Sequence, residues 1–231
     1  MNRRIVTAAQ MKKIEAAGNA HGLSYLQMME NAGLAVYKEL TRQFPQPGML
    51  LVVCGKGNNG GDGFVIGRAA AADGWKVTVL LAEGEPKTPD AITNFERLQG
   101  LPVEISTSCA TLESAHFPVV VDALYGTGFH GSLRPAGLAA CSLINRQRTD
   151  GAVVLAVDLP SGIHTDTGAA AEGAVHADLT VTFDSYKPLH FAPVSAPLCG
   201  KVVCADIGIL DEWHPEVLIS KENKKSEPFS Y

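Results

Sequence analysis

Short apolar runs alternate along this chain with segments in which apolar positions recur every three or four residues. The runs are continuous rather than alternating apolar and polar, which is typical of strands in a parallel sheet covered on both faces. Helical segments separate most of them, as in repeated strand–helix–strand units. Seven strands are predicted, at 51–54, 77–81, 103–105, 119–121, 153–157, 179–183 and 202–205.

Two helices are predicted before the first strand. Thr7 can cap the first of them, and Gly18 or Gly22 ends it. The second helix covers 23–44 and stops at a proline. Three further helices are predicted between strands, at 64–72, 90–99 and 138–146. This order of elements predicts an α/β fold.

Composition narrows the class of protein. With 231 residues, 46% hydrophobic and 6% aromatic, the chain can form one sizeable core. A net charge of −5, with no basic run interleaved with aromatics, argues against nucleic-acid binding. No apolar stretch is long enough for a membrane span and no secretory core follows the N-terminus, so we expect a cytoplasmic protein. One domain is predicted over 1–220, with a polar, disordered tail or shortened linker at 221–231.

The five cysteines favour reduced thiols. Their number is odd and no C-x-x-C spacing occurs. This pattern is typical of mostly buried, free cysteines rather than a disulfide framework or a zinc site.

A glycine-rich stretch follows the first strand. It reads C-G-K-G-N-N-G-G-D-G over 54–63. The order strand, glycine loop, helix is that of a nucleotide-binding turn. Five glycines in ten residues would permit positive φ and close approach of the backbone to a ligand. The oxygens of Asn58, Asn59 and Asp62 predict that nucleotide binding is combined here with a cation or with proton transfer.

Known phosphate motifs fit this stretch only in part. The Gly-Lys-Ser/Thr ending of a Walker A loop is missing. The pattern G-x-G-x-x-G does match, at Gly55, Gly57 and Gly60, although glycine-rich loops produce it readily. Glu83 lies about 20 residues further on and could hold a ribose. A tight turn without a ligand remains the alternative.

Three more polar loops follow predicted strands, at 122–132, 158–164 and, with a weaker pattern, 184–188. Ligands of open parallel sheets bind at the carboxyl ends of the strands, where these loops lie. Asp122 and Asp158 each follow an apolar strand, so burial should raise their pKa unless a cation or backbone amides hold them ionised. Such carboxyl groups suit proton transfer. The alternative is that each aspartate only caps its loop.

Two of these loops offer further candidate chemistry. The stretch 126–132 supplies backbone amides for phosphate; His130 within it is either a base or, as we favour, a solvated loop residue. Asn59, Asp122 and Ser161 offer hard oxygen ligands and little else. With one certain carboxylate among them, a monovalent cation helped by backbone carbonyls is favoured over a divalent one. The absence of a His/Cys cluster argues against zinc.

Four motifs carry a resemblance to a known family. They are M-E-N-A-G at 29–33, G-N-N-G-G-D-G at 57–63, V-D-A-L-Y-G-T-G at 121–128 and V-D-L-P-S-G at 157–162. In this order they closely resemble the NAD(P)HX epimerase family, the YjeF N-terminal domain. The resemblance implies a three-layer αβα Rossmann-like sandwich with a mostly parallel sheet, frequently a homodimer. It also implies interconversion of the R and S epimers of NADHX and NADPHX, so that a partner ADP- or ATP-dependent dehydratase can clear both.

The resemblance assigns roles to residues. Asp158 would be the substrate-contacting, catalytic carboxylate. One potassium ion (K+) per subunit would be held by Asn59, Asp122 and Ser161. Lys87 would be a candidate near the reacting ring, although a solvated surface lysine is the interpretation we favour. The implied substrate-binding residues are Asn58, Asn59, Gly60, Gly61, Asp62, Gly126, Thr127, Gly128, Phe129, His130, Gly131, Ser132 and Asp158.

The substrate carbon carries a hydroxyl and is bonded to the ring nitrogen. We hypothesise that Asp158 in its acid form helps this hydroxyl leave as water, and then acts as base when water returns to the other face. One alternative is a non-catalytic nucleotide-binding or scaffold module, but the retained Asp62, Asp122 and Asp158 favour an enzyme. A conventional dehydrogenase would need a second substrate domain. Because no dehydratase is encoded, the chain is expected to be a stand-alone epimerase or an excised half.

Overall fold

The structure, a computed structural model, describes residues 4–214. Within this range one seven-stranded sheet has the order β3-β2-β1-β4-β5-β6-β7, and all its neighbouring strands are parallel. The seven predicted strands are confirmed. Their bounds are β1 Met49–Cys54, β2 Lys76–Leu81, β3 Val103–Ser106, β4 Val119–Ala123, β5 Val153–Val157, β6 Leu179–Phe183 and β7 Lys201–Ala205.

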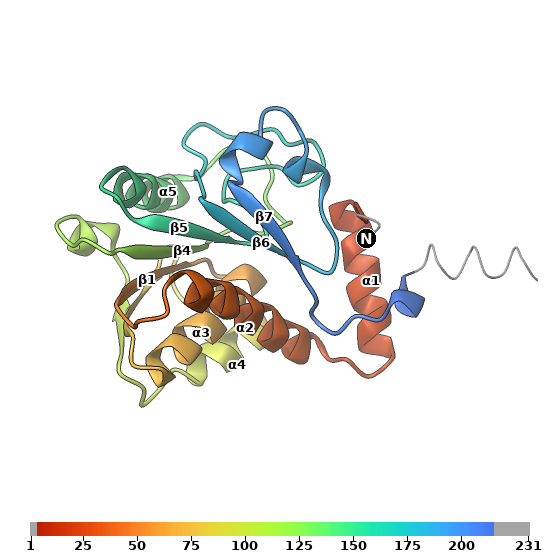
Figure 1. Ribbon diagram of the computed structural model, residues 1–231, viewed down its shortest axis with the longest axis horizontal. Helices are drawn as coiled ribbons and strands as arrows, with labels where there is room; N and C mark the ends of the chain where they lie inside the picture. Colours follow the sequence, from red (N-terminus) through yellow and green to blue (C-terminus); the bar gives the residue numbers. More distant parts are fainter. Residues whose placement is uncertain (1–3, 215–231) are drawn as a thin grey trace, which may run out of the picture.

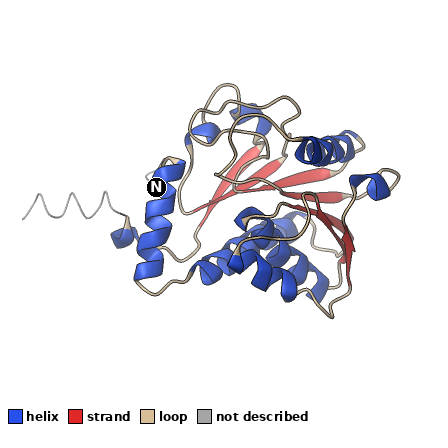
Figure 2. Cartoon of the chain, turned by 180° about the vertical axis from the view of Figure 1, so that it is seen from behind, coloured by secondary structure: helices blue, strands red, loops and turns tan. Residues whose placement is uncertain are grey.

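Helices cover both faces of the sheet, so the predicted three-layer architecture is confirmed (Figure 1; Figure 2 shows it from behind). α2, α3 and α4 pack together on one face and α5 lies against β4 and β5 on the other. The helices are α1 Ala8–Ala20, α2 Tyr25–Gln43, α3 Asn58–Ala72, α4 Pro89–Glu96 and α5 Pro135–Thr149. Short 3₁₀ helices are η1 Cys109–Leu112, η2 Pro188–His190, η3 Ala196–Leu198 and η4 Asp211–Trp213.

Burial of the continuous apolar strands stabilises this arrangement. Leu50, Leu51, Val52 and Val53 on β1 are all fully buried, because helices cover both faces of the central strands. Truncating one such leucine to alanine costs about 2–5 kcal/mol. The core therefore fixes the strand ends, and with them the loops that carry the polar motifs.

α1 stands apart from the other helices, at the β7 end of the sheet (Figure 1). Thr7 caps it as predicted, with a reciprocal bond to Gln10. The residues before it pair with the loop after β6, where Val6 N donates to Tyr186 O (2.9 Å). At its other end His21 stacks on Trp213 of η4, with ring centroids 5.5 Å apart. α1 is thus held at both of its own ends, by the loop after β6 and by η4.

α3 begins at Asn58, six residues before the predicted start at Phe64. The reason is packing: a Cβ on Gly60 would lie 1.9 Å from Gly55 O, and one on Gly61 would lie 2.5 Å from Met29 Sδ. No glycine of the stretch 55–63 has positive φ, so the prediction that they serve that purpose is wrong. They permit close approach, which brings the N-terminus of α3 to the edge of the sheet.

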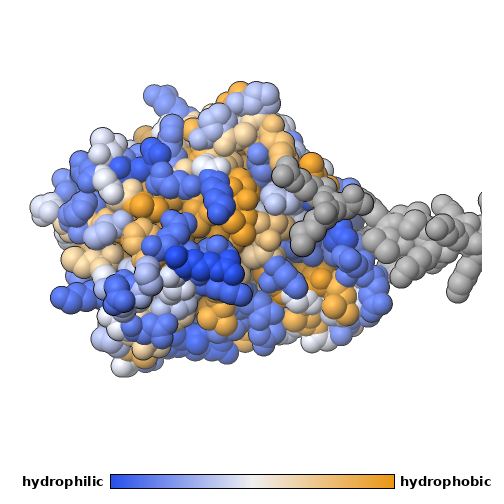
Figure 3. Space-filling view, in the orientation of Figure 1, coloured by the Kyte–Doolittle hydropathy of each residue, from blue (hydrophilic) through white to orange (hydrophobic). Residues whose placement is uncertain are grey.

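All five cysteines are free thiols, and three of them are buried. No helix within residues 4–214 is both long and apolar enough to cross a membrane. The predicted tail, 221–231, lies outside the described residues. β7, at one edge of the sheet, is only half-buried, and hydrophobic residues gather near it on the face shown in Figure 3.

Candidate functional site

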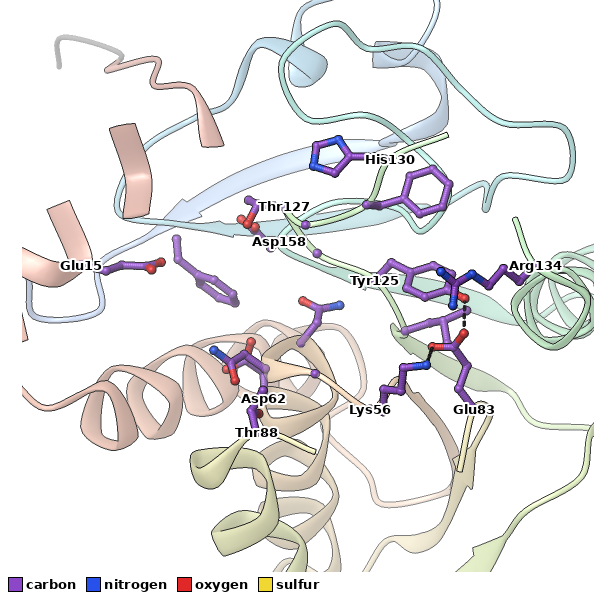
Figure 4. Close-up of a pocket in the computed structure, with 18 of the residues that line it drawn as sticks. Glu15, Lys56, Asp62, Glu83, Thr88, Tyr125, Thr127, His130, Arg134 and Asp158 are labelled. Carbon is purple, nitrogen blue, oxygen red and sulfur yellow. Dashed lines mark hydrogen bonds and ion pairs between the residues drawn. The ribbon is translucent and has the colours of Figure 1, made fainter. Parts of the chain in front are cut away.

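A pocket of about 570 Å³ opens at the carboxyl edge of the sheet (Figure 4). α1, the start of α3 and the loops after β1, β2, β4 and β5 contribute to it, together with the last residue of β6. It is lined by Glu15, Lys56, Gly57, Asn58, Asn59, Asp62, Glu83, Thr88, Leu124, Tyr125, Gly126, Thr127, Gly128, Phe129, His130, Ser132, Arg134, Asp158 and Phe183.

Most of the predicted substrate-binding residues meet in this pocket. The predicted residues that do not line it are Gly60, Gly61 and Gly131. Gly60 and Gly61 are packed inside α3, as described above, whereas Gly131 is exposed and has φ of 78°. These three glycines therefore shape the walls rather than contact the enclosed space.

The start of α3 presents unused hydrogen-bond donors to the pocket. Its N-cap, Gly57, provides no side-chain cap, so first-turn amides remain available. Two buried lining atoms, Asn59 Nδ2 and Thr88 Oγ1, have no hydrogen-bond partner among residues 4–214. Buried polar groups are normally bonded. These orphaned atoms and the positive end of the helix therefore indicate an anionic, hydrogen-bonding ligand.

Asp158 is held in a rare conformation beside a buried lysine. Its φ is 65°, an uncommon value for a residue other than glycine. Lys187 Nζ donates to Asp158 Oδ1 (2.6 Å), and the Thr182 hydroxyl donates to the same oxygen (2.8 Å). Burial alone would raise the pKa of Asp158, but the Lys187 ammonium and these hydrogen bonds outweigh it and hold the pKa below the ordinary value. Asp158 is therefore a carboxylate.

The sequence did not identify Lys187 as a site residue. It is fully buried and also donates to Thr182 Oγ1 (2.8 Å) and Phe183 O (3.1 Å). His190 lies next to it and accepts from Lys187 N at Nδ1 (3.0 Å), so its other nitrogen carries the proton facing Asp158 O (3.2 Å). Burial lowers the pKa of His190 to about 4, and the imidazole is neutral. The weak loop pattern at 184–188 was the available signal for Lys187.

The pKa values of two other carboxyl groups in the pocket are shifted upward, opposite to that of Asp158. Burial, together with the charges of Asp158 and Glu15, raises the pKa of Asp62 well above its usual value. Burial and the charge of Asp158 raise the pKa of Glu15 to about 7. Among the pocket's carboxyl groups, Asp158 is therefore ionised, and Asp62 and Glu15 bind a proton more readily than usual.

Glu15 was missed at the sequence level, although α1 carries a signal for it. Met11, Ile14 and Gly18 form the buried side of α1, and Glu15 follows this stripe at helical spacing. A carboxylate beside an apolar stripe is unusual unless it has a task, because burial penalises its charge.

Asp122 and Ser161 lie behind the pocket and bind each other. Ser161 donates to the Asp122 carboxylate from its hydroxyl (2.6 Å) and from its backbone N–H (2.7 Å), and Leu124 N donates as well (3.3 Å). Burial raises the pKa of Asp122 to about 6 against the effect of these bonds. Asn59 approaches from the other side, where a Cβ on Gly126 would lie 3.0 Å from its Oδ1. The predicted trio of oxygen ligands is thus gathered in one region.

The far end of the pocket is basic. Lys56 and Arg134 line it, and Glu83 accepts from the Tyr125 hydroxyl (2.9 Å) with Lys56 Nζ 3.8 Å away (Figure 4). His130 is exposed, in agreement with the solvated interpretation. Lys87 is exposed and does not line the pocket, also as favoured from the sequence.

Comparison with protein families gives one match. The family described as YjeF-related protein N-terminus matches residues 25–189 of this chain. The matched range includes four of the pocket's polar loops and both Asp158 and Lys187, but not α1.

Two relatives illustrate the similarity. The bifunctional NAD(P)H-hydrate repair enzyme Nnr of Pyrobaculum aerophilum is 39% identical over 217 residues, covering 90% of this chain and 42% of the relative. This chain therefore spans less than half the length of that protein. The NAD(P)H-hydrate epimerase of Limosilactobacillus fermentum is 35% identical over 213 residues, covering 89% of this chain and 98% of the relative.

A solved structure has the same fold. The crystal structure of yeast ynu0, YNL200c, superposes with a TM-score of 0.75 at 22% sequence identity, covering 99% of this chain and 96% of that chain. At this identity the likeness concerns the fold alone.

Proposed function

Because this chain belongs to the family of YjeF-related N-terminal domains, we propose that it interconverts the R and S epimers of the hydrated cofactors NADHX and NADPHX. The name of a relative matched over 98% of its length, NAD(P)H-hydrate epimerase, supports the reaction. The observation that carries the proposal is the set of carboxyl groups in the pocket. One is held ionised while its neighbours are held toward the neutral form, as acid–base catalysis requires.

The charge distribution in the pocket orients the substrate. In Figure 4 the carboxyl groups of Glu15, Asp62 and Asp158 lie toward one end, and Lys56 and Arg134 lie toward the other. The hydrated ring therefore faces the carboxyl groups and the phosphates face the basic end. The unused amides at the start of α3 and on the loop 126–132 contact the diphosphate.

Asp158 acts as a carboxylate throughout the reaction. This role replaces an initial proton donation by Asp158 in our proposal, because the salt bridge with Lys187 holds the pKa of Asp158 low. When the hydroxyl leaves, the ring becomes an iminium cation, and a fixed negative charge stabilises this cation. The proton that converts the leaving hydroxyl to water comes from Asp62, because burial and the charges of Asp158 and Glu15 raise its pKa and favour the acid form.

A potassium ion held by Asn59, Asp122 and Ser161 fits the residues present. Asp122 is fully buried and forms no salt bridge with any residue of the described range, in contrast to Asp158. Hard oxygens nearby include the Ser161 hydroxyl and Tyr125 O, which lies 3.4 Å from that hydroxyl. A bound potassium would supply the missing positive charge. Ser161 and Asp122 would then hold the loop 122–128 in its binding position.

Three expectations complete the proposal. A dehydratase consumes one epimer, and the bifunctional name of the Pyrobaculum relative supports that pairing. The protein forms a homodimer, for which the half-buried edge strand β7 offers an apolar surface. It acts in the cytoplasm. Sedimentation velocity of the full chain would test the dimer, and a species with the monomer's mass at micromolar concentration would contradict it.

The test of function uses separated R and S epimers of NADHX. We expect the purified protein to equilibrate either epimer much faster than the uncatalysed reaction, and to let an S-specific dehydratase clear the R form. In water labelled with ¹⁸O, each epimerisation should place the label on the substrate, because the hydroxyl leaves and solvent returns. No acceleration over buffer would favour a non-catalytic binding module instead.

A further inference from the structure

We propose that Glu15, on the N-terminal helix α1, is a second acid–base residue of this reaction and works with Asp62 on opposite faces of the substrate ring. The inference rests on the proposed epimerase function and adds a residue to it. Neither a motif of the sequence nor the family match, which begins at residue 25, includes Glu15.

The geometry makes Glu15 available to the substrate. Its carboxyl group points into the pocket from the wall formed by α1, whereas Asp62 lies on the wall formed by α3 (Figure 4). Glu15 forms no hydrogen bond or salt bridge with another residue between 4 and 214. By contrast, Asp158 Oδ1 accepts hydrogen bonds from both Lys187 and Thr182. A half-buried, unengaged carboxyl group in a polar pocket is free to bond a ligand.

The chemistry requires a second proton-transfer group. Epimerisation removes water from one face of the ring and adds it to the other. In one direction the C–O bond breaks as Asp62 gives its proton to the leaving hydroxyl, and a water then forms the new C–O bond while its proton passes to Glu15. In the other direction Glu15 gives the proton and Asp62 receives it. Protons balance in both directions, and exchange with water in the pocket restores the starting state.

Asp158 is unsuited to the second role. Its contact with Lys187 stabilises the carboxylate, so it is a weak proton acceptor and a rare donor. A group that must act in both senses works best when its pKa lies near the working pH. For Glu15 that value is about 7, set by burial and by the opposing charges around it. The charged groups facing it are Asp158, Lys187, Asp184, Lys12 and, across the pocket, Asp62.

The test compares Glu15→Gln with the wild-type chain on both epimers of NADHX. We expect Glu15→Gln to lower kcat by ~10²-fold or more in each direction and to leave the dissociation constant for NADH unchanged. In the wild type, kcat/KM should fall as pH decreases through about 7, because Glu15 must be ionised when Asp62 is protonated. The pH profile is the same for both directions, because the ratio of the two kcat/KM values equals the equilibrium constant. This fall in kcat/KM near pH 7, the acidic limb of the pH profile, should disappear in Glu15→Gln.

Two further variants separate catalysis from folding. Glu15→Asp keeps a carboxyl group and should retain part of the activity together with the limb near pH 7. Lys13→Gln lies on the exposed side of the same helix and should behave as wild type. If Glu15→Gln keeps the wild-type rate, or loses rate but keeps the limb, the assignment of Glu15 is overturned while the epimerase function stands. If the wild-type chain does not accelerate epimerisation, both proposals fail.

Discussion

Asp122 and Asp158 are two aspartates at the carboxyl ends of neighbouring strands, yet their pKa values are shifted in opposite directions. Asp122 lies near the end of β4, directly after its apolar residues, and Asp158 directly follows β5. Both aspartates are buried. Asp158 has a lysine 2.6 Å away and its pKa is lowered, whereas Asp122 is bonded only by uncharged donors and its pKa is raised to about 6. Burial therefore does not determine the state of a strand-end carboxylate; the cation beside it does. Asp158 has its own cation in the chain, whereas for Asp122 we propose an ion from solution.

The largest effect is expected from Asp158→Asn. Removing the fixed negative charge beside the iminium cation should lower kcat for epimerisation by at least ~10²-fold, with NADH binding retained. Because Lys187 is left unpaired, the double variant Asp158→Asn/Lys187→Met serves as the folding control. A fully active Asp158→Asn enzyme would remove Asp158 from the mechanism.

Lys187→Met should make Asp158 resemble Asp122. Leaving a buried carboxylate without its partner costs about 3–5 kcal/mol of unfolding free energy. In the wild type the lowered pKa of Asp158 contributes stability at pH values above its unfolded pKa, which is lost as pH falls through the folded pKa. In the variant burial raises the pKa, so acidification should instead reduce the destabilisation. Urea denaturation across pH 4 to 8 measures this, with Lys201→Met on the exposed edge as control. An unchanged pH dependence would contradict the role of Lys187.

Potassium should stabilise the folded protein through Asp122 and not through Asp158. At a hundredfold excess over its dissociation constant, an ion bound only by the folded state stabilises by about 2.7 kcal/mol. We expect thermal unfolding to shift upward in potassium chloride relative to choline chloride, in the wild type and in Asp158→Asn. Asp122→Asn should abolish the shift. A shift that survives in Asp122→Asn would place the ion elsewhere.

The smallest effects are expected from the hydroxyl groups that donate to each carboxylate. Ser161→Ala and Thr182→Val each remove one hydrogen bond to a carboxylate, worth about 1.5–3 kcal/mol. The loss of unfolding free energy in Thr182→Val should lie at the low end of this range, because Lys187 still donates a hydrogen bond to Asp158. Chemical denaturation of both variants would reveal the order, and an equal or reversed order would show that the lysine does not compensate.

The fold was predictable from the sequence because apolar runs and helical spacing report burial directly. All seven strands and five helices were located, and Thr7 was identified as a cap. The start of α3 was not, because five glycines in the stretch 54–63 indicate a loop unless the neighbouring backbone is known. Gly60 lies within α3, and a glycine is needed there because Gly55 O leaves no room for a side chain. No local sequence pattern indicates that these two segments lie in contact.

The site was predictable where residues follow strands, and not where they come from elsewhere. Asn59, Asp122 and Ser161 could be grouped as candidates because parallel strands end at one edge of the sheet, and the structure joins Asp122 to Ser161 directly. Lys187 and Glu15 come from a weakly patterned loop and a separate helix, so their meeting with Asp158 depends on the tertiary structure. The sequence left open whether burial raises the pKa of Asp158 or a cation holds it ionised, because the lysine beside it was not identified.

The contacts that hold α1 in place allow the segment after β7 to influence the pocket. Trp213 of η4 stacks on His21, and Arg4 binds Asp211, so this segment fixes the helix on which Glu15 lies. A shift of η4 would move a carboxyl group relative to the ring without altering any residue that binds the cofactor. Substitutions in 206–214 should therefore act on turnover rather than on affinity, and a search for variants of altered rate could begin in this segment, which contains none of the four sequence motifs.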